Sequence, residues 1–187
     1  MMIRFLSACA LLACATPAFA KDHMMDATFI DPVPATVASA PVSCKITFTS
    51  LKDERETPDL VGTFFEDELQ PPADRAAWIK SMMEGLNRRG FDVRFGEAPP
   101  EYHPMGVALT TLWSDLYNGA FNATVKFRIT SADLARPFDR TLRGSFSRTL
   151  FMATVQGRSN EAVHGAVANA LDRVADALLG WCGGKPA

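Results

Sequence analysis

The chain has 187 residues, a length that favours a single domain, since domains usually contain about 100–200 residues. Hydrophobic residues make up 48% of it, the share expected of a globular protein rather than of a disordered chain or a protein that spans a membrane many times. The formal net charge of −2 argues against a dedicated nucleic-acid-binding protein, which is normally strongly basic.

The first twenty residues have the features of a secretory signal peptide. Arg4 supplies a positive charge, a largely apolar run covers residues 5–15, and residues 18–20 read Ala-Phe-Ala, a small-residue cleavage site. The run is too short for a transmembrane helix, which needs about 20 apolar residues. We therefore predict that residues 1–20 are a signal peptide, cleaved after Ala20, and that the mature chain is periplasmic.

A second interpretation of the same segment is a lipid attachment signal. Residues 11–14 read Leu-Leu-Ala-Cys and resemble a bacterial lipobox, in which a small residue precedes the cysteine that receives the lipid. Lipidation at Cys14 would make the protein an outer-membrane lipoprotein, held at the membrane only by that anchor. Both interpretations place the folded part in the oxidising bacterial envelope.

Residues 21–42 contain three prolines and many alanines, and their apolar residues follow no sustained period. Such a composition is typical of a linker rather than of a helix or strand. We expect these residues to form a flexible leader or tether outside the core.

Two of the four cysteines, Cys44 and Cys182, lie beyond the signal region. A pair of cysteines in an oxidising compartment predicts a disulfide, and two unpaired buried thiols are the alternative. A metal site would need further ligands at suitable spacing, whereas the three histidines are scattered along the chain. We expect neither a metal nor a cofactor.

In the first half of the domain, apolar and polar residues alternate, then apolar residues recur at helical spacing, and then the alternation returns. Residues 43–49 alternate apolar and polar side chains, which predicts a strand with one buried face. Residues 52–72 are acidic and rich in turn formers. Apolar residues at helical spacing over 74–89 predict a helix that ends at Gly90, and residues 91–95 predict a second strand.

The second half predicts three long strands and a long helix. Residues 106–117 form the first strand, and Asn118-Gly119 is a strong signal for a hairpin turn. The alternation is clearest over residues 121–129 and weaker over 139–151. Residues 160–181 then carry apolar side chains in steps of three and four, which predicts a helix with one buried stripe.

These elements follow one another in the order β-α-β-β-β-β-α within one domain at 43–184. Strands with one dry face must bury that face, and helices with one apolar stripe can cover it. The sequence therefore predicts an α+β fold, a two-layer sandwich with a mostly antiparallel sheet of four or five strands and two helices on one face.

Several segments resemble the YajG-like family of bacterial envelope lipoproteins. They are Asp53-x-Arg55, Leu86-Asn-Arg-Arg-Gly-Phe91, Leu112-Trp-Ser-Asp-Leu116 with Gly119, the alternating strand 121–129, and Glu161-Ala-Val with Ala170-Leu171. The resemblance covers about 44–180 and implies an exported, usually lipidated protein without an established catalytic role. It carries over no functional residues, and the imperfect lipobox and the cysteine pair depart from the family pattern. The chain also resembles a second candidate family, the auxiliary lipoproteins of envelope ABC transporters.

The sequence carries no complete catalytic motif. Glu161-x-x-His164 lacks the second such motif that a di-metal site needs, and Gly144-Ser-Phe-Ser147 lacks the second glycine of a nucleophile elbow. We therefore expect that the protein is not an enzyme. The alternative is a small periplasmic hydrolase or transferase acting on envelope polymers, with a site assembled from loop residues near strand ends: Asp53, Arg55, His103 and Asp115.

Charge is distributed unevenly along the chain. Residues 126–158 contain seven basic and two acidic side chains, a local net charge of +5, whereas residues 52–101 have a net charge of −5. Strand alternation places Lys126, Arg128 and Arg143 together on the solvent face of the sheet. We predict that this face is a binding surface for an envelope protein or an anionic envelope component, and we expect no nucleic-acid partner.

Phe64 and Phe65 lie next to three consecutive acidic residues. Aromatic residues are enriched where proteins dock, so an exposed anchor is one interpretation of this pair. The alternative is that the pair closes the edge of the hydrophobic core.

The cleavage site can be tested by the intact mass of the protein purified from a native host. We expect a mature chain that begins at Lys21, because the Ala-Phe-Ala site lies at the usual distance from the apolar run. A chain that begins at Cys14 with a diacylglyceryl or triacyl adduct would contradict free secretion and establish the lipoprotein.

Overall fold

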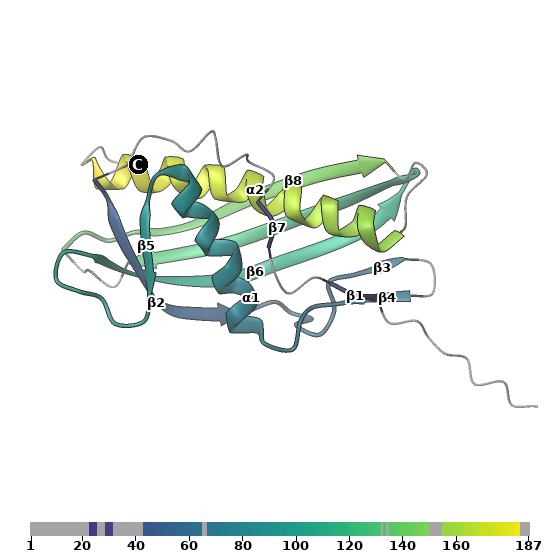
Figure 1. Cartoon of the computed structure of the whole chain (residues 1–187), viewed down its shortest axis with the longest axis horizontal. Helices are drawn as coiled ribbons and strands as arrows, with labels where there is room; N and C mark the ends of the chain where they lie inside the picture. The colour runs from purple at the N-terminus through teal and green to yellow at the C-terminus, as the bar shows by residue number, and fades with distance from the viewer. Residues whose placement is uncertain are drawn as a thin grey trace, which may run out of the picture.

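Two helices and a curved sheet form an α+β fold, as predicted (Figure 1). The computed structural model describes residues 23–25, 29–31, 43–64, 67–131, 133, 135–149 and 155–183. The predictions made for Cys14 and for cleavage after Ala20 lie outside the described residues.

The described strands are β1 (His23–Met24), β2 (Lys45–Asp53), β3 (Gly62–Phe64), β4 (Asp67–Gln70), β5 (Asp92–Phe95), β6 (His103–Tyr117), β7 (Ala120–Ser131) and β8 (Asp139–Thr149). The helices are α1 (Arg75–Met83), which continues into the 3-10 turn η2 (Glu84–Arg89), and α2 (Val155–Cys182). The five predicted strands correspond to β2, β5, β6, β7 and β8. The short strands β1, β3 and β4 are additions to the predicted sheet.

The long strand β6 is the centre of the sheet. It pairs with β7 in an antiparallel hairpin, and β7 pairs with β8 in the same way. On its other side β6 runs parallel to β2 over its first half and to β3 near its end. β2 is also parallel to β5, because α1 and η2 carry the chain across between them, as parallel neighbours require.

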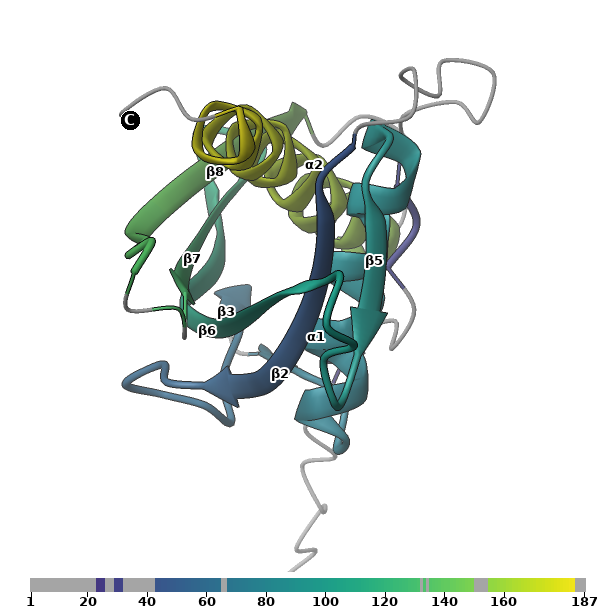
Figure 2. The same cartoon turned by 90° about the vertical axis from the view of Figure 1, so that its left-hand side faces the viewer.

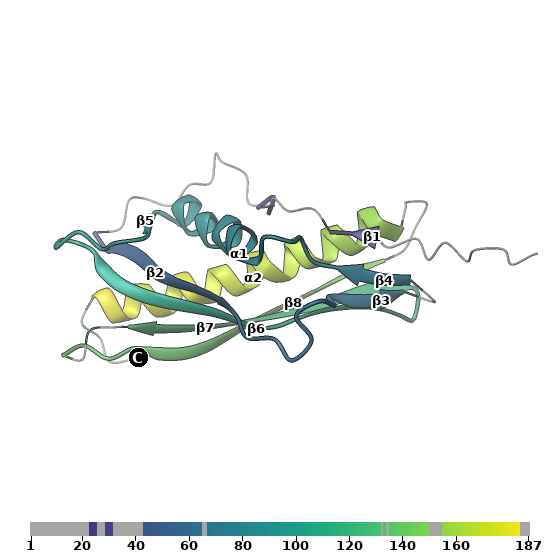
Figure 3. The same ribbon diagram turned by 90° about the horizontal axis from the view of Figure 1, so that it is seen from below.

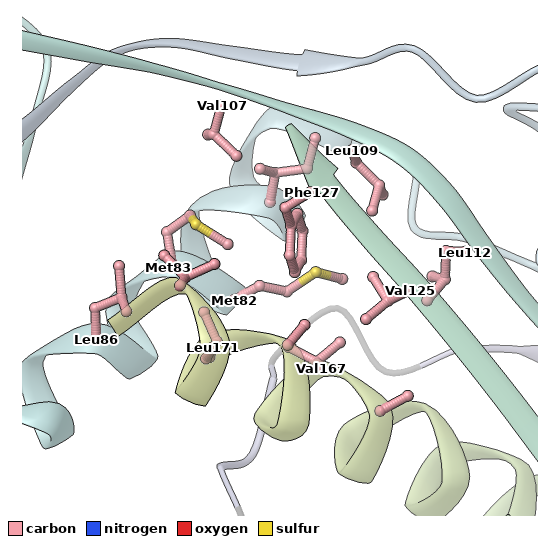
Figure 4. Close-up of a cluster of buried hydrophobic side chains, with 14 of the residues drawn as sticks. Met82, Met83, Leu86, Val107, Leu109, Leu112, Val125, Phe127, Val167 and Leu171 are labelled. Atoms are coloured by element: carbon pink, nitrogen blue, oxygen red, sulfur yellow. The ribbon is translucent and has the colours of Figure 1, made fainter. Parts of the chain in front are cut away.

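Both helices lie on the inner side of the curved sheet, as the view along it shows (Figure 2). Helix α2 runs along the length of the molecule (Figure 3) and packs across β7 and β8, whereas α1 packs on β2. Figure 4 shows the centre of the resulting core. Among its fully buried side chains are Met82, Leu86, Leu109, Phe127 and Leu171, which come from both helical segments and the two central strands.

The helical segment formed by α1 and η2 begins and ends where the sequence predicts, although its second part is a 3-10 turn. The carboxylate of Asp74 accepts a hydrogen bond of 2.8 Å from the backbone N–H of Ala77, which caps the first turn. Gly90 ends η2 with a φ of 87°, in the left-handed region that glycine adopts without strain.

A disulfide joins Cys44 to Cys182, as predicted, with the two Cα atoms 5.8 Å apart. It links the start of β2 to the end of α2 across 138 positions of sequence. The Arg136 side chain lies beside it, with its guanidinium 4.8 Å from the centre of the Trp181 ring, and donates hydrogen bonds to the carbonyl oxygens of Trp181 and Cys182. A cation suits this position, because the last carbonyls of a helix carry partial negative charge.

Residues 23–25 and 29–31 pack against the domain, whereas the sequence predicts a leader outside the core. Strand β1 pairs with β4, and Met25 is buried. The Asp31 carboxylate forms an ion pair of 2.5 Å with the buried Arg89, which also contacts Asp172 of α2 at 2.7 Å. Arg89 therefore links this N-terminal segment, the end of η2 and α2.

Gly144 allows α2 to approach β8 closely. A Cβ atom placed on Gly144 would lie 2.0 Å from the carbonyl oxygen of Ala166 and 2.4 Å from the backbone nitrogen of Ala170. Both are backbone atoms of α2, so no side-chain rotation could relieve the clash. The distance between sheet and helix therefore depends on the missing side chain.

We predict that Gly144→Val lowers the free energy of unfolding by about 3 kcal/mol, because the added methyl groups must push α2 away from the sheet. Ser145→Val is the matched control, since it adds a similar side chain at the next, exposed position of the same strand and should change stability by less than about 0.5 kcal/mol. Urea denaturation measures both. Equal stabilities for the two variants would contradict the close approach.

Candidate functional site

The face of the sheet opposite the two helices, which we call the open face, carries mostly polar side chains in cross-strand rows. The pairing registers and strand alternation define its members. They include Ser50 and Lys52 from β2; Thr63 from β3; Gly106, Ala108, Thr111, Trp113, Asp115 and Tyr117 from β6; Ala120, Asn122, Thr124, Lys126, Arg128 and Thr130 from β7; and Asp139, Thr141, Arg143, Ser145, Ser147 and Thr149 from β8.

Lys126, Arg128 and Arg143 lie together on this face, where the sequence places them. Lys126 stands directly opposite Arg143 in the β7–β8 pairing. The alternate residues of β7, among them Val125 and Phe127, are fully buried on the helix side, which fixes the direction of the three basic side chains.

Arg128 has a partner that sequence reasoning missed. Its guanidinium donates two hydrogen bonds to the Asp139 carboxylate, at 2.9 and 2.6 Å. These bonds hold the pKa of Asp139 below its ordinary value and raise the pKa of Arg128. The charge of Arg128 is therefore largely compensated within the protein.

Lys126 and Arg143 differ from Arg128, because in the described part of the chain neither forms an ion pair. Arg143 donates one long hydrogen bond, of 3.4 Å, to the Thr124 hydroxyl. Directly opposed like charges destabilise an antiparallel pair. The uncompensated positive charge of the three predicted residues is thus concentrated in the Lys126–Arg143 pair.

A groove of about 210 Å³ lies beside Arg128, over the central strand. Its floor is low because β6 presents only Gly106 and Ala108 to the open face there. The side chains around the floor come from β2, from the residue that follows it and from β7, and are Ser50, Lys52, Glu54, Arg128 and Thr130. Sequence reasoning missed this groove, although two small residues two positions apart on the polar side of a long strand are a visible signal.

Trp113 is a large aromatic residue near the middle of the open face, whose β6 end also carries the exposed Tyr117. It pairs with Thr124, which puts its side chain on the same side as Lys126, and it is half-buried. The other two tryptophans, Trp78 and Trp181, are buried in the core. Sequence reasoning did not single out Trp113, although it stands between Thr111 and Asp115 at polar-face positions of the strand.

The four residues proposed for an enzymatic site do not come together at one place. The buried Arg55 side chain binds the Asp53 carboxylate at 2.8 and 2.7 Å and the carbonyl oxygens of Pro58 and Leu60, so Asp53 and Arg55 hold a turn together. His103 begins β6, where its ring packs against Trp181 at 4.9 Å. Asp115 lies near the other end of the same strand, roughly 40 Å along an extended chain.

Glu161 and His164 also do not form a common site. Hydrogen bonds from Arg158 and Arg148, at 2.6 and 2.7 Å, outweigh the upward effect of desolvation and hold the pKa of Glu161 below its ordinary value. The His164 ring instead contacts Phe29 edge-on at 5.7 Å. Across the residues that the structure describes, histidine, cysteine and acidic side chains nowhere gather in groups of three that could hold a metal ion.

Phe64 is buried and its ring lies 5.4 Å from that of Phe121. For this residue the interpretation as an edge of the core is therefore confirmed, whereas Phe65 lies outside the described residues. None of the helices in the described ranges has the length and apolar character needed to cross a membrane.

No family model matches the chain, and no curated protein does. Among solved structures it is similar to the protein XCC0632 from Xanthomonas campestris, of family-model DUF330, with 12% identity, a TM-score of 0.46, and 79% of this chain and 92% of that chain covered. A candidate lipoprotein from Caulobacter crescentus has 12% identity, a TM-score of 0.36, and coverages of 74% and 95%.

A third similar structure is a candidate neuraminyllactose-binding hemagglutinin homolog from Helicobacter pylori, with 8% identity and a TM-score of 0.36. The match covers 79% of this chain and 91% of that chain. At such low identities and TM-scores a likeness assigns neither family nor function.

Proposed function

We propose that this chain is a non-catalytic accessory protein of the bacterial cell envelope that acts by binding, as an adaptor or ligand-presenting domain of the YajG-like kind. The observation that carries the proposal is the uncompensated Lys126–Arg143 pair on the open face. A protein that keeps two like charges opposed pays for it in stability, and a bound anion would remove that cost.

The envelope location rests on two features of the chain. The signal peptide predicted from residues 1–20 would direct export, and the Cys44–Cys182 disulfide suits an oxidising compartment. We infer that the mature protein is periplasmic after cleavage at Ala20, with an outer-membrane lipoprotein anchored through Cys14 as the alternative.

The partner we propose is an anionic envelope component or an envelope protein with an acidic surface. Lysine and arginine bind carboxylate and phosphate groups, and arginine can do so with two parallel hydrogen bonds. The Lys126 and Arg143 side chains reach solvent, and the opposite faces of their strands pack in the core. Little therefore needs to move on binding.

Two observations support a binding role over the hydrolase or transferase alternative. His103 lies far from Asp115, and the Asp53–Arg55 pair has a structural role. A general acid–base pair must lie within hydrogen-bond reach of one substrate, directly or through one water. Residues at opposite ends of one strand cannot meet this requirement together.

The proposal predicts that Lys126→Glu/Arg128→Glu/Arg143→Glu loses its partner in pull-downs from envelope extract, with recovery reduced at least tenfold. The matched control is Lys80→Glu/Arg140→Glu/Arg173→Glu, which makes the same charge change at exposed positions away from the open face. The control should recover the partner as the wild type does.

Circular dichroism must show both triple variants folded for the comparison to hold. Unchanged recovery by the folded open-face variant would overturn the proposed binding surface, as would an equal loss in the control.

A further inference from the structure

We propose that the open face binds an acidic glycan, a saccharide chain that carries carboxylate or phosphate groups, with Lys126 and Arg143 on the anion and Trp113 against a sugar ring. This inference rests on the binding role proposed above and names the ligand class. Its three parts are the charge pair, the aromatic side chain and the polar character of the remaining face.

The charge pair selects for an anion. Lys126 and Arg143 are cross-strand neighbours, whose Cα atoms in an antiparallel pair lie about 4.5–5.5 Å apart. One carboxylate or phosphate can therefore accept hydrogen bonds from both side chains at once. Arg128 contributes less, because its Nε and Nη2 atoms already donate hydrogen bonds to the Asp139 carboxylate.

Trp113 adds an aromatic contact that a simple anion would not use. Its side chain projects from β6 into the row next to Lys126, about 7 Å further along the strands. The face of an indole ring carries negative charge density and attracts the positively polarised C–H groups of a sugar ring. An aromatic ring next to an anion site therefore fits a charged sugar.

The other side chains of this face distinguish a glycan from an acidic protein. Around Trp113 and Lys126 they are mostly hydroxyl and amide groups, with one carboxylate, that of Asp115: Thr111, Asn122, Thr124, Ser145 and Ser147. The centre of a protein–protein interface is usually apolar, and a membrane-binding face inserts several apolar side chains. A row of short hydroxyl side chains instead matches the hydroxyl groups of a saccharide by hydrogen bonding.

The groove over Gly106 and Ala108 extends the surface in the direction of the strands. It begins where the Lys126 row ends, since the next row contains Ala108 and Arg128. A linear polymer that leaves the Trp113 row would pass over the charge pair and enter this groove. The site therefore suits an extended chain better than a single sugar.

The test measures the affinity of the full mature chain for four probes at one fixed ionic strength: polygalacturonate, polyaspartate, neutral dextran and phosphatidylglycerol vesicles. We expect polygalacturonate to bind at least tenfold more tightly than each of the other three. Lys126→Gln/Arg143→Gln should weaken it at least tenfold, and the matched control Arg140→Gln/Arg173→Gln should not.

Trp113 provides the readout that separates a sugar from any other polyanion. Trp113→Leu should weaken polygalacturonate about tenfold and leave polyaspartate unchanged, whereas Trp113→Phe should keep the aromatic contact and most of the affinity. The wild-type tryptophan fluorescence should change on binding, and Trp113→Phe should abolish that change because Trp78 and Trp181 are buried.

Failure of polygalacturonate to bind, or an equal or tighter binding of polyaspartate or of the vesicles, would overturn the glycan assignment. So would unchanged polygalacturonate affinity in the folded Trp113→Leu variant. If the glycan assignment fails but partner recovery in the pull-down still depends on Lys126, Arg128 and Arg143, the binding function stands. Its ligand is then a protein or a lipid surface. If neither assay depends on these residues, the open face is not the site.

Discussion

The close packing of α2 against β7 and β8 is the contact on which the rest of the structure depends. Gly144 removes the side chain that would separate the two layers, and the long apolar stripe of α2 then covers Val125 and Phe127. Because α1 packs on the same side of the sheet, the opposite side is left to water. Strand alternation then decides that every second residue of β7, including Lys126, belongs to the open face.

Specific bonds hold this arrangement at one end and near its middle. The Cys44–Cys182 disulfide and Arg136 fix the C-terminal end of α2 to the start of β2. Near the middle of α2, the buried Arg89 binds Asp31 and Asp172, so a buried cation has a carboxylate on each side. A sheet held in this way presents its outer side chains from a rigid support, which is what a preformed binding surface requires.

Local patterns predicted much of this fold, and contacts between distant residues account for what they missed. Three confirmed predictions depend only on neighbours in sequence. They are the alternation of apolar and polar residues over 121–129, the apolar stripe of α2 and the turn at Asn118-Gly119. The parallel pairing of β2 with β6 and the groove beside it depend on which strands become neighbours, which no local period encodes. The basic face was visible from alternation alone, but the Arg128–Asp139 pair that compensates one of its charges joins two strands.

The central claim is that the open face keeps opposed positive charges for binding rather than for stability. A double-mutant cycle on Lys126 and Arg143 tests it, with Lys126→Thr, Arg143→Thr and the double variant unfolded in urea at low ionic strength. The account predicts a destabilising interaction of about 0.2–1 kcal/mol between the two side chains in the wild type, reduced by added salt. A stabilising interaction, or none at low ionic strength, would contradict it.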